Sequence, residues 1–234
     1  MNDVLFIQHD DHVGPGLLSE LLPEARLLRA WEQPEALTGL LQAHSAGTSA
    51  LPGALVVLGG TMDAYADEAA PWLPATRELM RRCVADDVKV LAICLGHQLL
   101  AVATGGEVGV GAASEKGLTD LWWSADLPED GPFADLAEAI AGTPYAWGDH
   151  ADAVTRLPEG ACLWATSQTC PQVFTIGSAL GVQFHPEVTE ALVIDWLTRG
   201  GADAETRESL LASYRSHAER LRDTCEHLAA WVSC

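Results

Sequence analysis

The amino-acid sequence predicts an α/β domain built on an open, mostly parallel β-sheet flanked by helices, with an additional C-terminal helix. Three short apolar runs are continuous rather than alternating, which is typical of strands buried on both faces of a sheet. The segments between them are amphipathic, and alternation of strand and helix favours parallel strands joined by right-handed crossovers. We expect strands at residues 4–7, 54–58 and 88–93, and helices at residues 15–22, 34–44 and 72–85.

After Gly105 and Gly106, the alternation of strands and helices gives way to several short segments that we expect to be strands. The tail at 204–232 contains neither Gly nor Pro, and its apolar residues recur at steps of three and four, as on one face of a long helix. We expect this helix to dock on the domain rather than to form an intermolecular coiled coil. The organisation predicted is therefore one domain at 1–200 with a helical extension packed on it at 201–234. Further strands are expected at 107–110, 118–123, 161–165, 173–176 and 180–184, and a helix at 192–197.

Composition excludes several classes of protein. The 234 residues are 48% hydrophobic, which is enough for one sizeable core, and the net charge of −20 opposes binding to nucleic acid. No apolar stretch approaches the roughly 20 residues of a membrane span, and the N-terminus lacks the basic start of a secretory signal. The six cysteines form no CxxC pair. We therefore expect a cytoplasmic protein with reduced thiols and no membrane association.

Cys94 lies where the strand expected at 88–93 turns into a helix. The carboxyl edge of an open α/β sheet is where ligands bind, and the start of a helix favours a thiolate at that corner. Gly96 allows the helix to approach the sheet closely. By itself, however, a cysteine in an apolar run is more often a small core residue.

His185 and Glu187 offer the base and the orienting group that a thiol nucleophile needs. They follow an apolar strand, and residues two apart in an extended chain point the same way, so the carboxylate can lie beside the imidazole. Pro186 holds the extended geometry. His97 is only three residues from Cys94 and cannot easily reach over the sulfur. The alternative interpretation of His185 and Glu187 is an ordinary polar strand end.

Gly59 and Gly60 follow the strand expected at 54–58. Paired glycines permit an unusual turn that exposes backbone N–H groups, as an oxyanion site requires. The N–H of Leu95, directly after the cysteine, would be the second donor. A plain glycine loop is the alternative.

The cysteine corner, the glycine pair and the His-Pro-Glu segment each lie within a longer motif. The order and separation of these motifs make the chain resemble a class I glutamine amidotransferase, of the stand-alone type that is similar to the amidotransferase domain of GMP synthase. The resemblance covers nearly the whole chain. Its motifs are GGTMDAYAD (59–67), AICLGHQLLA (92–101), HADAVTRLPEGA (150–161) and GVQFHPE (181–187), with weaker matches at EKG (115–117) and TSQTCPQVF (166–174).

The resemblance implies a flavodoxin-like core with seven or more strands, and it implies no cofactor and no metal. It assigns Cys94 as the nucleophile and His185 and Glu187 as the rest of a catalytic triad. Gly60 and Leu95 match the oxyanion donors. The substrate-binding positions that it implies are Gly59, Gln98, Asp149, His150, Ala151 and Asp152.

Three positions depart from the family pattern. Ala92 replaces a usual glycine, and we expect the turn to survive because alanine is the smallest substitute. Thr61 replaces a common proline. Asp149 stands where tryptophan is usual, and its carboxylate would repel a free α-carboxylate. A γ-glutamyl compound other than glutamine is therefore an alternative substrate.

The leading hypothesis is an enzyme that hydrolyses a γ-glutamyl amide through a glutamyl-thioester. The alternatives are a glutaminase subunit that delivers ammonia to a separate synthase partner, and a catalytically silent binding domain. A metal enzyme is less favoured, since the ligands at 9–12 match no standard zinc spacing. His150 and Asp152 could also bind a metal, but a role in the substrate loop is favoured.

Overall fold

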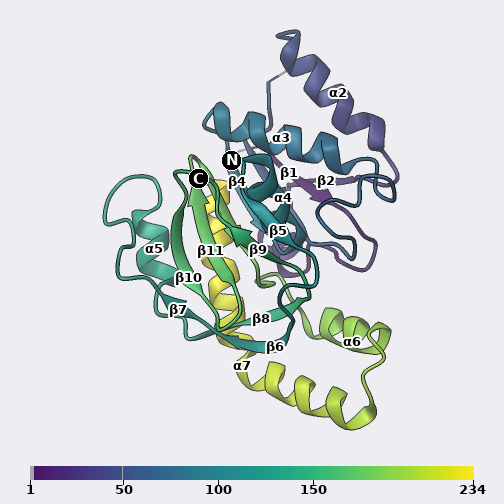
Figure 1. Ribbon diagram of the computed structural model, residues 1–234, viewed down its shortest axis with the longest axis vertical. Coiled ribbons are helices and arrows are strands. Elements are labelled where there is room, and N and C mark those ends of the chain that lie inside the picture. Colours follow the sequence, from purple (N-terminus) through teal and green to yellow (C-terminus); the bar gives the residue numbers. More distant parts are fainter. Residues whose placement is uncertain (1–2, 49) are drawn as a thin grey trace.

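The main sheet has eight strands and carries helices on both faces (Figure 1). The computed structural model describes residues 3–48 and 50–234. The strands of this sheet are β1 (Val4–Gln8), β2 (Arg26–Arg29), β3 (Ala54–Val57), β4 (Lys89–Ile93), β7 (Trp122–Trp123), β10 (Cys162–Thr166), β11 (Pro171–Ile176) and β12 (Ala179–Val182). Their order is β2-β1-β3-β4-β12-β11-β10-β7, parallel from β2 to β12 and antiparallel from there to β7. The predicted open, mostly parallel sheet is confirmed.

Two antiparallel strand pairs lie outside the main sheet. β5 (Glu107–Gly109) pairs with β9 (Ala153–Arg156), and β6 (Glu115–Asp120) pairs with β8 (Tyr145–His150). The segment expected as one strand at 118–123 is divided between β6 and β7. β2, β8 and β9 were not predicted, because their residues are largely polar or partly exposed and carry no continuous apolar signal.

Helices cover both faces of the main sheet because successive strand residues point to opposite sides. Val4 and Phe6 of β1 face one apolar cluster, whereas Leu5 and Ile7 face the other. The first cluster includes α1, α5 and α7, the second includes α2, α3 and α4, and α6 packs against α7. The helices are α1 (Leu17–Leu21), α2 (Pro34–Ser45), α3 (Leu73–Ala85), α4 (Leu95–Ala103), α5 (Ala134–Ile140), α6 (Glu190–Arg199) and α7 (Ala204–Ser233).

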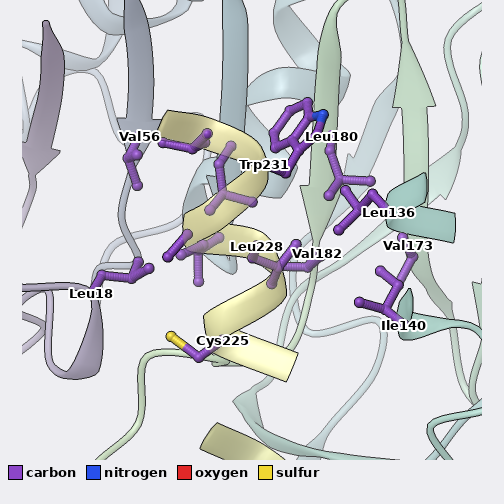
Figure 2. Packing of buried hydrophobic residues seen from close by; sticks show 14 of the residues in the cluster. Leu18, Val56, Leu136, Ile140, Val173, Leu180, Val182, Cys225, Leu228 and Trp231 are labelled. Carbon is purple, nitrogen blue, oxygen red and sulfur yellow. The ribbon is translucent and has the colours of Figure 1, made fainter. Parts of the chain in front are cut away.

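The C-terminal helix α7 packs along the domain with the apolar face that the sequence predicted. Figure 2 shows Leu228 and Trp231 of its last turns facing Val56 of β3 and Leu180 of β12. The first half of α7 packs instead on α6 and β8, where Tyr214 joins a separate cluster. Because α7 contributes to both clusters, we propose that residues 1–200 and 201–234 form one folded unit.

The described part of the chain contains neither a membrane-spanning helix nor a disulfide. None of its helices combines the length and the apolar composition that crossing a bilayer requires. All six cysteines lie in this part, and no two of them are bonded to each other.

We predict that Leu228→Ala lowers the free energy of unfolding by about 2–5 kcal/mol, because the substitution removes buried methyl groups and leaves a cavity beneath the sheet. Leu228 is fully buried. Urea unfolding followed by circular dichroism measures the change. Glu219→Ala, at an exposed position of the same helix, is the control and should stay close to wild type. Equal stability of the two variants would show that α7 is not part of the cooperative core.

Candidate active site

Cys94 occupies a strained corner between β4 and α4. Its φ of 51° and ψ of −105° lie in a region that residues with a side chain rarely adopt. The corner is fixed from both sides, since the Cys94 N–H donates to the carbonyl of Val182 (2.9 Å) and the Gln98 N–H donates to the carbonyl of Cys94 (3.1 Å). A strand-to-helix turn of this kind presents a nucleophile at the edge of a sheet.

Gly96 permits this corner because α4 passes very close to β3. A Cβ atom on Gly96 would lie 2.2 Å from the carbonyl oxygen of Val57, which is a severe overlap with backbone. Ala92, one of the departures from the family pattern, is fully buried in β4 opposite Val57 of β3 and Gly181 of β12. The turn at Cys94 is therefore formed with alanine at this position.

His185 and Glu187 form a buried pair next to Cys94. His185 Nδ1 lies 2.7 Å from Glu187 Oε1, and both side chains are at most 4% exposed. The His185 N–H donates to the carbonyl of Trp147 (2.8 Å), which ties the pair to β8. Burial lowers the pKa of His185. The negative charge of Glu187 and the proximity of Cys94 raise this pKa by a larger amount, so it lies well above the ordinary value of 6.5. Glu187 and Cys94 therefore favour the protonated imidazolium over the neutral imidazole.

The two predicted glycines have different positions. A Cβ on Gly59 would lie 2.9 Å from His185 Cε1 and 3.5 Å from Cys94 Cβ, so the thiol and imidazole meet above this residue. Gly60 lies beside Leu95 and lines a cavity with it. Leu95 is the first residue of α4, where backbone N–H groups have no acceptor within the helix.

A cavity of about 580 Å³ opens above the corner, within the size range of small-molecule sites. Glu187 and Gly59 lie behind its wall. His97, on α4, is not among the residues that line this cavity. It is buried against Phe174, and burial lowers its pKa to about 3. The cavity is lined by nine of the residues predicted from sequence: Gly60, Cys94, Leu95, Gln98, Asp149, His150, Ala151, Asp152 and His185.

The loop at 149–152 is anchored through the carbonyl oxygen of Asp152. Gln98 Nε2 donates to this oxygen (3.0 Å), and His150 Nδ1 lies 3.0 Å from it. The other ring nitrogen of His150 lies 2.9 Å from a carboxylate oxygen of Glu115 on β6. The predicted substrate loop therefore depends on contacts from both α4 and β6.

The carboxylates of this loop have partners. Asp152 Oδ1 accepts a hydrogen bond from the Gly111 N–H (2.7 Å), and Asp149 Oδ1 lies 3.8 Å from Lys116 Nζ. Lys116 also lines the cavity. The repulsion that we expected between Asp149 and an α-carboxylate is therefore opposed by a cation at the same wall.

Sequence reasoning missed the wall formed by α6. The ring of Trp196 lies 4.6 Å from that of His185, centroid to centroid, and its Nε1 donates to the carbonyl of His12 (2.8 Å). A helix was predicted here, but its periodicity does not say which partner each face meets. The other cavity-lining residues without a predicted role at this site are Asp10, His12, Val13, Thr61, Met62, Lys116, Arg199 and Gly200.

The polar segment at 9–12, which was considered as a metal site, lies partly in the core and partly at the cavity. His9 is buried, accepts a hydrogen bond from Trp72 Nε1 at its Nδ1 (3.1 Å), and has a pKa lowered by burial to about 3. Asp10 faces the cavity, where its carboxylate accepts hydrogen bonds from the Thr61 hydroxyl and the His12 N–H. His9 and Asp10 thus contribute to the packing around the Gly60 loop.

The chain is similar to known proteins in sequence. Residues 38–192 match the family profile described as glutamine amidotransferase class-I. A subunit of the glutamine-hydrolysing GMP synthase from Thermococcus kodakarensis is 39% identical over 120 residues, or 50% of this chain and 56% of that protein. The corresponding protein of Methanocaldococcus jannaschii is 41% identical over 103 residues, or 42% and 50%. The matches thus span about half the length of these curated relatives.

Solved structures resemble the chain over nearly its full length. A glutamine amido transferase from Methylobacillus flagellatus superposes with a TM-score of 0.76 at 26% identity, covering 99% of this chain and 94% of that one. A glutamine amidotransferase from Thermotoga maritima superposes with a TM-score of 0.75 at 24% identity, covering 99% and 98%, and this second likeness concerns the fold alone.

We predict that Gly96→Ala lowers stability by about 1–3 kcal/mol or more, because the added methyl group overlaps the Val57 carbonyl. Gly39→Ala is the matched control, since Gly39 lies in α2 with open space around it. There the same change should stabilise by about 0.5–1 kcal/mol. Urea unfolding of both variants measures the contrast, and a Gly96→Ala protein as stable as wild type would contradict the close approach of α4 to β3.

Proposed function

Because the chain belongs to the class I glutamine amidotransferases, a family of enzymes, we propose that it hydrolyses the γ-glutamyl amide of glutamine or of a γ-glutamyl compound. The observation that carries this proposal is the placement of Cys94 at a strained corner beside the His185–Glu187 pair, at the floor of a cavity. A thiol, an imidazole and a carboxylate in this order are the groups that thioester chemistry needs.

In the proposed acylation step, the Cys94 thiolate attacks the carbonyl carbon of the side-chain amide. The carbonyl electrons move to oxygen, and the N–H groups of Gly60 and Leu95 stabilise the resulting oxyanion. His185 donates its proton to the departing nitrogen, the C–N bond breaks, and ammonia or an amine leaves. A γ-glutamyl thioester on Cys94 is the product of this step.

In the deacylation step, the neutral His185 removes a proton from water, and the resulting hydroxide attacks the thioester carbonyl. The C–S bond then breaks, glutamate leaves, and the thiolate–imidazolium pair is restored. Glu187 holds the imidazole through Nδ1, so that Nε2 faces the reacting atoms and the imidazolium is stabilised. Gln98 and the loop at 149–152 would hold the amino-acid end of the substrate.

A second candidate function follows from the relatives. Two of them are named as subunits of a glutamine-hydrolysing GMP synthase. On that basis the chain would release ammonia to a separate synthase partner. Strong activity of the purified chain alone on a γ-glutamyl compound favours a free-standing hydrolase, whereas activity that requires a partner favours the role of a synthase subunit.

We predict that Cys94→Ala abolishes release of glutamate, because no thioester can form without the sulfur. The test is a mass-spectrometric screen of glutamine and γ-glutamyl compounds against the purified wild type and this variant. His185→Ala should lose about 10²–10⁴-fold in rate, the usual contribution of general acid–base catalysis. Near-wild-type turnover in Cys94→Ala would overturn the assignment.

Covalent labelling separates an active enzyme from a silent domain of the same fold. A diazo-ketone analogue of glutamine should add one label per chain, at Cys94, as shown by peptide mass spectrometry. The Cys94→Ala variant is the negative control. Absence of label under conditions that modify a known glutaminase would favour the silent domain.

We also predict that Glu187→Gln shifts the alkylation of Cys94 by iodoacetamide to higher pH. Removal of the carboxylate charge lowers the pKa of His185, so the imidazolium beside the sulfur is lost as pH rises through a lower value. A thiolate without this cation is less favoured, and the alkylation rate at neutral pH should fall. Glu219→Gln, on the exposed side of α7, should keep the wild-type profile. Identical profiles for wild type and Glu187→Gln would exclude this electrostatic role.

A further inference from the structure

A second group of chemically reactive side chains lies behind the cavity. Glu115 of β6, His150 of β8 and Cys170, which directly precedes β11, bring a carboxylate oxygen, an imidazole nitrogen and a thiol sulfur within 4.8 Å of one another. The side chains of His150 and Glu115 are 2% and 8% exposed. Three elements distant in sequence thus place three different ligand types at one shielded point.

The environment of His150 suits a positive charge at this point, which either a second proton on the imidazole or a bound metal ion supplies. Its Nδ1 faces the carbonyl oxygen of Asp152, and its Nε2 faces the carboxylate of Glu115, so both ring nitrogens face hydrogen-bond acceptors. A neutral imidazole has one N–H, which leaves the lone pair of the other nitrogen facing an acceptor. If Nδ1 donates to Asp152, Nε2 is free to bind a metal ion between itself and Glu115. The contact from Nδ1 to a backbone carbonyl is the one that commonly orients histidines that bind metals.

Gln172 offers a fourth donor. Its Nε2 lies 2.7 Å from Glu115 Oε2 and 3.3 Å from Cys170 Sγ. Its Oε1 is buried and has no hydrogen-bond partner among the described residues. The two ends of an amide have nearly the same shape, so a half-turn of this group would direct Oε1 at the cluster and present an oxygen ligand to an ion.

We propose that Glu115, His150 and Cys170 form a binding site for a divalent cation of the zinc class, with Gln172 Oε1 or water as the fourth ligand. A mixed set of nitrogen, sulfur and oxygen donors suits zinc. Zinc–ligand bonds of about 2.0–2.3 Å place tetrahedral ligands about 3.5 Å apart. The most distant donors, up to 4.8 Å apart, must therefore approach by about 1 Å, and His150 Nε2 and the Glu115 oxygen, 2.9 Å apart, must separate by about 0.6 Å. The Cys170 thiol proton, and any proton held between His150 and Glu115, pass to the buffer on binding.

The proposed site is separate from the hydrolytic chemistry but shares one residue with the cavity wall. His150 holds the carbonyl of Asp152 and lines the cavity, whereas Cys170 and Glu115 lie behind it. Metal binding therefore does not require turnover, and it can be tested whether or not the chain hydrolyses a γ-glutamyl amide.

The test uses the full chain carrying Cys94→Ala, because Cys94 and His185 are another thiol–imidazole pair that could bind zinc. Titration with Co²⁺ should saturate at one ion per chain and produce a thiolate-to-cobalt charge-transfer band, which Zn²⁺ then displaces. Adding Cys170→Ala should abolish the band. Adding Cys162→Ala, which removes an exposed thiol outside the cluster, should leave the band unchanged. Adding Glu115→Gln should weaken binding by at least about 10–100-fold, the range measured for residues that only support metal ligands.

X-ray absorption of the zinc-loaded Cys94→Ala protein gives a readout that does not depend on a destabilising variant. We expect one sulfur at about 2.3 Å and nitrogen or oxygen ligands at about 2.0–2.2 Å. The proposal is overturned by failure to bind Co²⁺ or Zn²⁺ stoichiometrically, by an ion without a sulfur ligand, or by a charge-transfer band that survives Cys170→Ala.

Discussion

The parallel pairing of β4 with β12 is the constraint on which the candidate site depends. It places Ile93 opposite Val182, so the chain leaves both strands at the same edge, one residue before Cys94 and three before His185. The Cys94 N–H extends this pairing by donating to the Val182 carbonyl. Two side chains far apart in sequence are thus brought together by a register that the buried faces of the two strands enforce. A slip of one residue would turn every buried side chain of β12 to the other face, so the site and the core are specified together.

The buried carboxylate of Glu187 depends on stabilising contacts from the residues around it. Its side chain is fully buried, and one of its oxygens has no hydrogen-bond partner among the described residues. Burial in such a place penalises the charged form of a carboxylate. The imidazole of His185, 2.7 Å from the other oxygen, opposes this penalty. The backbone around Glu187 is held as well, because its carbonyl accepts from the Leu17 N–H of α1 and that of Val188 accepts from Tyr214 of α7. The long C-terminal helix thus also helps to fix the backbone next to the candidate triad.

The sequence predicted the parallel core and the residues that meet at its edge. Continuous apolar runs located β1, β3 and β4, and two short motifs after strands, His185-Pro186-Glu187 and Gly59-Gly60, indicated the candidate site. The rest could not be predicted because its signals are not local. β8 is a strand of mixed apolar and polar residues whose role comes from pairing with β6, and the orientation of Trp196 follows from how α6 packs. The partner of His150 was also out of reach, since Glu115 is 35 residues away and was only part of a weak motif.

The distribution of charge along the cavity bears on the proposal that an acidic chain binds an amino acid there. The net charge of −20 would disfavour an α-carboxylate, and Asp10, Asp149 and Asp152 all line the cavity. Each of these three carboxylates, however, already has a partner: the Thr61 hydroxyl, the Lys116 ammonium and the Gly111 N–H, respectively. The Lys116 ammonium offsets the charge of Asp149, whereas the two neutral donors stabilise the carboxylates of Asp10 and Asp152. Fields from more distant surface charges are weakened over a Debye length of about 8 Å at physiological ionic strength. Cationic side chains line the same cavity, among them Lys116 and Arg199, so the potential that a bound ligand would meet is set by these near neighbours rather than by the total charge.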